Sequence, residues 1–192
     1  FFFVLISRLG LFFIDALGDD IPFVPKTAYY YGIPISAGAM MIMATLNAEM
    51  AILFSLVISF LTGILLESDL LFALYYFLSC LIGASGCTHL KERTRIFRAG
   101  FFVGLANVVM AFLVGIFRTT YSPIYESIAW DMVFGFLGGI LSSFIVILGI
   151  VPAETFFGYA TDFKLLELGN QNLEILKRFL VQAPGTYHHS VI

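Results

Sequence analysis

Long apolar runs, separated by short polar stretches, make up most of this chain. Each run approaches the ~20 residues that an α-helix needs to cross the hydrocarbon core of a bilayer. The polar stretches contain proline, glycine, asparagine and acidic residues, which favour turns and helix ends. This pattern predicts six transmembrane helices, which we place at residues 1–17, 30–46, 50–66, 70–87, 99–117 and 130–151.

The pattern changes after the sixth run. Val151-Pro152 predicts the end of the last span, because proline cannot continue a helix without losing a backbone hydrogen bond. Thr161 is a suitable N-cap for a short helix. Leu173 and Leu176 begin a one-sided apolar stripe that is typical of a second, amphipathic helix. The tail is therefore predicted to form a short helical linker that packs on the membrane face or on a domain that follows.

The composition supports a membrane protein. Hydrophobic residues make up 60% of the 192 positions and charged residues 12%, and the mean hydropathy is +0.97. Soluble globular domains have roughly 45–50% apolar and about 25% charged residues. We therefore predict an all-α fold, a polytopic transmembrane helix bundle of six spans followed by a short helical cytoplasmic linker, with the lipid bilayer as a partner. The net charge of −3 and the lack of a basic stripe argue against binding to a nucleic acid polymer.

The positions of the lysine and arginine residues predict the orientation of the bundle. Seven of them lie in two segments that the alternation of six spans places on one side of the membrane: Lys91, Arg93, Arg95, Arg98, Lys164, Lys177 and Arg178. The loops on the opposite side hold Lys26 and Arg118. By the positive-inside rule the first side is cytoplasmic, so the tail is predicted to lie in the cytoplasm.

Small residues recur at a four-residue spacing inside several predicted spans. They are Gly100 and Gly104, Gly135 and Gly139 with Ser143, and Ser79 and Gly83 with Cys87. In lipid, this spacing lets two helix backbones approach closely. We interpret the motifs as packing sites within the bundle, and a homodimer surface is the alternative.

Tyrosines and cysteines in these spans are given structural roles. The consecutive residues Tyr29, Tyr30 and Tyr31 fit an aromatic belt at the membrane interface. Cys80 and Cys87 are seven residues apart, which is ~10.5 Å along a helix and too far for a disulfide. We therefore predict that both cysteines are small residues at helix contacts.

A few polar side chains lie inside the predicted spans. Arg8 is near the middle of the first span, Asp15 follows two turns later on a similar face, and Asn107 is in the middle of the fifth span. A polar or ionisable group inside the membrane is by default a functional-site hypothesis. We therefore take Arg8, Asp15 and Asn107 as a candidate intramembrane polar site. The alternative for Arg8 is a side chain that reaches the interface.

The end of the chain carries a more specific signal. The tail contains Pro152-x-Glu154-x-x-Phe157-Gly158 and Thr161-Asp162-x-x-Leu165-Leu166-Glu167-Leu168, and residues 183–190 read Ala-Pro-Gly-Thr-Tyr-His-His-Ser. Together with the apolar spans, these motifs resemble the bacterial seven-transmembrane receptors with an intracellular HD hydrolase domain. This is the family of the PgpH-type cyclic-di-AMP phosphodiesterases.

The resemblance implies a domain organisation and a metal site. In the family an extracellular domain precedes seven spans, so residues 1–151 would hold the last six. Residues 152–183 would be the linker and 184–192 the beginning of the HD domain. HD domains hold a pair of divalent metal ions, here expected to be Fe or Mn, that activate a hydroxide. By its position in the motif, His189 would be the first metal ligand. The other ligands would lie beyond this chain, so the fragment is not expected to be catalytic alone.

The functional hypothesis follows from this resemblance. The bundle would lie in the bacterial cytoplasmic membrane and sense or relay a signal to a cytoplasmic HD phosphohydrolase that hydrolyses cyclic-di-AMP. The last span and the linker would transmit the signal. Two alternatives stay open, namely a small-solute transporter or ligand-binding membrane module, and a passive anchor.

Overall fold

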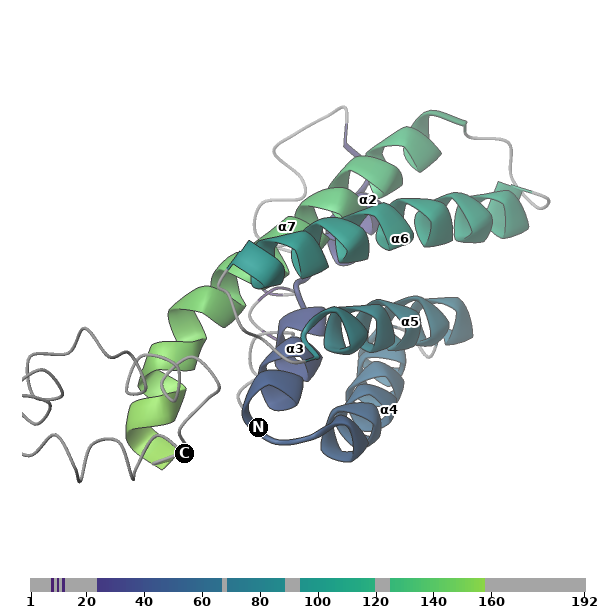
Figure 1. Ribbon diagram of the computed structural model, residues 1–192. Coiled ribbons are helices and arrows are strands. Elements are labelled where there is room, and N and C mark those ends of the chain that lie inside the picture. Colours follow the sequence, from purple (N-terminus) through teal and green to yellow (C-terminus); the bar gives the residue numbers. More distant parts are fainter. Residues whose placement is uncertain are drawn as a thin grey trace, which may run out of the picture.

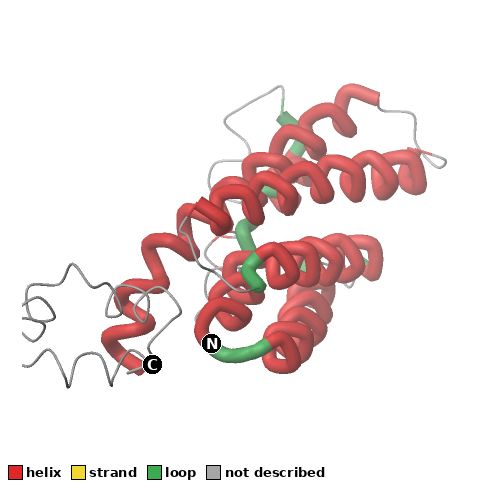
Figure 2. Tube along the Cα trace, in the orientation of Figure 1, coloured by secondary structure: helices red, strands yellow, loops and turns green. Residues whose placement is uncertain are grey.

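The computed structural model describes residues 8, 10, 12, 24–66, 69–88, 94–119 and 125–157. Within these ranges the chain forms α-helices joined by short turns, with no strand (Figure 2). The helices are α2 (Lys26–Tyr31), α3 (Ser36–Thr45), α4 (Ala48–Leu65), α5 (Leu70–Gly86), α6 (Thr94–Thr119) and α7 (Tyr125–Phe157). The prediction of an all-α bundle is confirmed.

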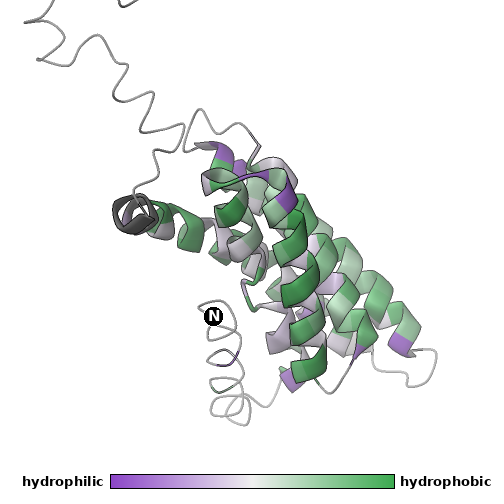
Figure 3. Cartoon of the chain, turned by 90° about the horizontal axis from the view of Figure 1, so that it is seen from below, coloured by the Kyte–Doolittle hydropathy of each residue, from purple (hydrophilic) through white to green (hydrophobic). Residues whose placement is uncertain are grey.

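Three of the described helices are long and apolar enough to cross a membrane. They contain the segments Ala48–Leu65, Thr94–Arg118 and Ser127–Ile150, and α5 is a slightly shorter apolar helix. Large apolar side chains such as Phe60, Phe102 and Leu148 are exposed on these helices. Figure 3 shows that hydrophobic residues predominate along the helices. Contiguous exposed apolar surface of this kind marks a membrane-contacting face, so the bundle is a transmembrane one.

Helices α6 and α7 lie side by side over much of their length (Figure 1). Their glycines make the contact, because there is no room for side chains between the backbones. A Cβ atom on Gly139 would lie 2.3 Å from the backbone nitrogen of Gly104, and a Cβ atom on Gly100 would lie 2.5 Å from the Cβ atom of Ser143. The two GxxxG pairs therefore face each other, which confirms their predicted role in packing the bundle.

The third small-residue motif packs α5 against its neighbours. A Cβ atom on Gly83 would lie 2.8 Å from the Met40 side chain of α3 and 3.3 Å from Val103 of α6. Cys80 and Cys87 are buried and free. The cysteines are therefore packing residues, as predicted.

The predicted second span, at residues 30–46, is not one helix. Helix α2 ends at Tyr31, and α3 begins only at Ser36. Pro34 lies in the segment between them. Proline lacks the N–H group that a helix needs and disfavours a helical conformation at the residue before it. The prediction of a continuous span was therefore wrong, and the chain turns inside the bundle instead.

The predicted end of the last span at residue 151 agrees with the apolar segment, which ends at Ile150, but the prediction that the helix itself ends at Pro152 was wrong. Helix α7 contains Pro152 and runs on to Phe157. Proline removes one hydrogen bond from a helix but is tolerated in membrane helices whose freed groups find other partners. The 33 residues of α7 have a length of about 50 Å, roughly 20 Å more than the hydrocarbon core of a bilayer. Figure 1 shows α7 projecting past the end of α6.

Candidate intramembrane polar site

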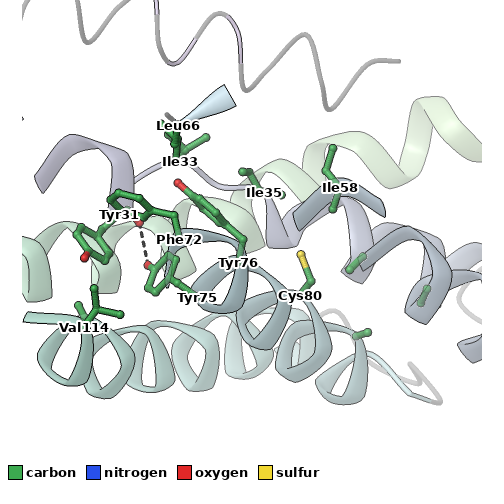
Figure 4. Close-up of a cluster of buried hydrophobic side chains, with 14 residues drawn as sticks. Tyr31, Ile33, Ile35, Ile58, Leu66, Phe72, Tyr75, Tyr76, Cys80 and Val114 are labelled. Carbon is green, nitrogen blue, oxygen red and sulfur yellow. Dashed lines mark hydrogen bonds between the residues drawn. The ribbon is translucent and has the colours of Figure 1, made fainter. Parts of the chain in front are cut away.

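The break between α2 and α3 ends the regular hydrogen bonding of the helix, although the carbonyl oxygen of Tyr30 still accepts from the backbone nitrogen of Ile33 at 3.3 Å. Two tyrosines of α5 donate to the carbonyl groups at the end of α2. The hydroxyl of Tyr75 donates to the carbonyl oxygen of Tyr31 at 3.0 Å (Figure 4), and the hydroxyl of Tyr76 donates to that of Tyr30. An unsatisfied carbonyl group in hydrocarbon costs several kcal/mol, so these side chains stabilise the break.

The same residues form an aromatic cluster inside the bundle. The ring of Tyr31 lies 4.9 Å from that of Tyr75 and 5.0 Å from that of Phe72, measured between centroids. Tyr31 is only 1% exposed, since its ring packs against Phe72 and Tyr75 and its backbone lies against α7 at Gly138. The predicted aromatic belt was therefore wrong for Tyr31, whose side chain points into the bundle (Figure 4).

Asn107 of α6 is buried, and only 3% of its surface is exposed. Its amide nitrogen Nδ2 donates to the carbonyl oxygen of Gly135 in α7 at 3.1 Å. A carbonyl oxygen only accepts hydrogen bonds, so the amide nitrogen faces Gly135 and the oxygen Oδ1 faces away from it. This Oδ1 atom is buried and has no hydrogen-bond partner. Asn107 thus both joins the two helices and presents an unused acceptor.

Asp131 of α7 is a second buried acceptor. It is 6% exposed, and its Oδ1 atom has no hydrogen-bond partner. Asp131 precedes Gly135 by four residues, so the two lie on one face of α7, the face that Asn107 contacts. Sequence analysis did not select Asp131, although it lies within the predicted span 130–151, where a carboxylate is itself a signal of function.

A charged pair lies beside these groups. Arg118, near the end of α6, forms an ion pair with Asp69, which precedes α5. The guanidinium carbon of Arg118 also lies 4.7 Å from the centre of the Phe72 ring. The charge of Arg118 acts on both Asp131 and Tyr31. The polar site therefore comprises Tyr31, Asn107 and Asp131, with the Arg118–Asp69 pair at its side.

Of the other predicted site residues, the structure describes only Arg8. Arg8 is exposed, whereas Asn107 is buried, and the site that combines them with Asp15 stays a prediction. Asp15 and His189 lie outside the described residues, as do the predicted linker helices after residue 157 and most of the first span. Among the residues that the structure describes, no group of three His, Cys, Asp or Glu side chains could hold a metal ion. The metal role of His189 and the pairing of Arg8 with Asp15 remain predictions.

Comparison with known proteins identifies the family. Residues 1–161 match the family described as "7TM receptor with intracellular HD hydrolase". The chain belongs to this family. It is 33% identical over 169 residues to the cyclic-di-AMP phosphodiesterase PgpH of Bacillus subtilis, covering 84% of this chain and 24% of that protein. It is 32% identical over 163 residues to the PgpH protein of Listeria monocytogenes, covering 83% and 22%. No solved structure matches.

The match to the 7TM receptor family rests on the membrane part of the chain. It ends at residue 161, before the histidine motif at residues 183–190. The family match therefore confirms the predicted resemblance from the membrane part of the chain. The chain spans about a quarter of the length of the curated relatives that it matches.

Proposed function

We propose that this chain is the membrane receptor part of a metal-dependent HD phosphohydrolase that hydrolyses cyclic-di-AMP. Its family and its relatives of that name support the proposal. In this proposal residues 152–183 are a cytoplasmic linker, residues 184–192 begin the HD domain, and an extracellular domain precedes the bundle. The bundle lies in the bacterial cytoplasmic membrane with the linker on the cytoplasmic side. The distribution of lysine and arginine residues supports this orientation.

His189 is proposed as the first ligand of the metal pair, with Fe or Mn as the expected metals. When bound, such a pair supplies a metal-activated hydroxide for attack on phosphorus. The remaining ligands belong to the part of the polypeptide that follows. This chain contributes the membrane part of the protein, and it is not expected to hydrolyse the nucleotide alone.

The continuity of α7 is the observation that carries the receptor role. One helix includes Asp131 of the polar site, the glycines of the α6–α7 contact and Phe157 beyond the apolar span. Packed helices switch between discrete arrangements by small translations or rotations. A change in packing around Asp131 would therefore move the cytoplasmic end of α7, and with it the linker to the HD domain.

The test uses insertions into the linker of the intact protein. One, two or four alanines placed between Gly169 and Asn172 would each change the rotational phase of a helical linker by about 100° per residue. We expect altered regulation of cyclic-di-AMP hydrolysis, with unchanged expression and thermal stability. The control is a matching insertion between α6 and α7 at residues 120–124, where regulation should persist. Unchanged regulation in every linker variant would contradict the transmission role.

A second candidate function is a small-solute transporter or ligand-binding module. The helix break between α2 and α3 favours it, because interrupted helices near polar side chains form the substrate sites of many transporters. Vesicles containing only the bundle would then accumulate a solute. A passive anchor is the third candidate. Replacing the bundle with an unrelated membrane segment would then leave the regulation of cyclic-di-AMP hydrolysis intact.

A further inference from the structure

The polar site contains more acceptor atoms than the protein satisfies. The oxygens Asn107 Oδ1, Asp131 Oδ1 and the hydroxyl groups of Tyr29 and Tyr31 are buried without hydrogen-bond partners. Burying such groups costs free energy unless something binds them. Four unsatisfied atoms near one helix interface are therefore more than a packing defect would leave, since most buried polar groups in proteins have partners.

Neighbouring donors are committed elsewhere. The hydroxyl of Tyr75 is used by the carbonyl group of Tyr31, and Arg118 pairs with Asp69. The amide nitrogen of Asn107 is used by Gly135. Each of these three donors has a partner, so a ligand that brings its own positive charge can bind the free oxygens.

We propose that Asp131, Asn107 and Tyr31 bind a small monovalent cation of the sodium or potassium class inside the membrane bundle. The carboxylate supplies one negative charge, which matches one positive charge. Hard cations prefer oxygen ligands, and the carboxylate, the amide and the phenol all present oxygens. The adjacent break between α2 and α3 is the feature that builds cation sites in membrane transporters, where unwound backbone and half-helices surround the ion.

A proton on Asp131 fits the site less well than a cation. Protonation would neutralise the carboxylate and give it one O–H donor, which can serve only one of the free oxygen atoms of Asn107 and Tyr31. Among the described residues, the charged and titratable groups that act on this region include Tyr31 of α2, Tyr75 and Tyr76 of α5, Arg118 of α6 and Asp69 before α5. Arg118 acts on Asp131 but also pairs with Asp69, so the two carboxylates and the single guanidinium leave one net negative charge for the cation.

The proposed site has a defined place in the receptor. With the predicted orientation, Asp131 lies in the half of the bundle that faces away from the cytoplasm. If the receptor function proposed above holds, the cation is the signal that the bundle reads. Binding is measured without reference to hydrolysis, so the two proposals can fail separately.

The experiment measures thermal unfolding of the intact protein in detergent at constant ionic strength. Sodium or potassium chloride replaces N-methyl-D-glucamine chloride, whose cation is too large for a buried site. We expect the Tm to rise saturably with sodium or potassium. Asp131→Asn should lower the apparent affinity at least tenfold. Tyr31→Phe, which keeps the aromatic ring, should lower it severalfold and provides a second variant should Asp131→Asn not fold.

Glu49→Gln is the matched control, since Glu49 is an exposed acid at the start of α4. It makes the same chemical change as Asp131→Asn and should leave the cation response intact. Equal stabilisation by all three cations would overturn the proposal, as would a full response in Asp131→Asn and Tyr31→Phe. A Tm that depends on Asp131 and pH but on neither alkali cation would show a proton site and would overturn it too.

Discussion

The hydroxyl of Tyr75 binds the carbonyl oxygen of Tyr31 at 3.0 Å, where the chain leaves α2. A side chain of one helix thereby completes the backbone hydrogen bonding of another. This contact permits a helix break inside a membrane bundle, since free carbonyl groups are costly there. It also places the ring of Tyr31 beside α5, where it contributes to the polar site.

Replacing Tyr75 with phenylalanine tests this contact. Tyr75→Phe keeps the ring but leaves the carbonyl of Tyr31 buried without a donor, so we expect a loss of about 1–2 kcal/mol in unfolding free energy. Tyr29→Phe is the control, because the Tyr29 hydroxyl has no hydrogen-bond partner. Thermal unfolding of the intact protein compares the two variants. A Tyr75→Phe protein as stable as Tyr29→Phe would show that the break does not need this hydrogen bond.

A methyl group at Gly139 should separate α6 from α7. Its Cβ atom would meet backbone atoms of Gly104 at 2.3 and 2.5 Å, and backbone moves less readily than a side chain. We expect Gly139→Ala to cost about 1–3 kcal/mol of stability and to alter the basal hydrolysis rate of the intact protein. Gly149→Ala is the control, because the nearest atom there is the flexible Met41 sulfur at 3.3 Å. Comparable effects of the two changes would argue against a special role for the glycine contact.

The Arg118–Asp69 pair is expected to contribute little to stability. Both side chains are about one-third exposed, at 35% and 29%, and solvent-exposed pairs contribute ~0–1 kcal/mol. Asp69→Asn removes the charge while keeping an oxygen to accept from the backbone nitrogen of Leu71, as Asp69 does at 2.8 Å. Asp69→Ala also removes this N-cap and should cost about 1 kcal/mol more. Denaturation curves that rank Asp69→Asn as the more harmful change would contradict this assignment.

Cysteine labelling tests the orientation. Glu49 lies at the predicted cytoplasmic start of α4 and Arg118 at the opposite side, so a membrane-impermeant maleimide added outside intact cells should label Arg118→Cys and spare Glu49→Cys. The native Cys80 and Cys87 are buried, which keeps the background low. Labelling of Glu49→Cys from outside would reverse the orientation and place the tail outside the cytoplasm.

The sequence predicts the apolar helices well because their length and composition are local properties. The spans at 50–66 and 70–87 agree with α4 and α5 within a few residues. Pro34 and Pro152 show where this reasoning ends. The first breaks a helix and the second does not, and the difference depends on tertiary partners such as Tyr75 that no local pattern reveals.

The polar site was predictable only in part. Asn107 was selected because a polar side chain in the middle of a span is unusual. Asp131 lies next to Trp130 near the start of its span, where a charge looks interfacial, and its burial results from the packing of α7 against its neighbours. The sequence also suggested an interfacial position for Tyr31, because tyrosine side chains occur both at membrane interfaces and in protein cores.

The touching backbones of Gly104 and Gly139 have a mechanical consequence. Because no side chains lie between the two backbones there, α7 can tilt about this contact more easily than it can move away from α6. Asp131 is about 12 Å from Gly139 along the helix and Phe157 about 27 Å on the other side. A tilt of α7 about Gly139 therefore displaces Phe157 roughly twice as far as it displaces Asp131.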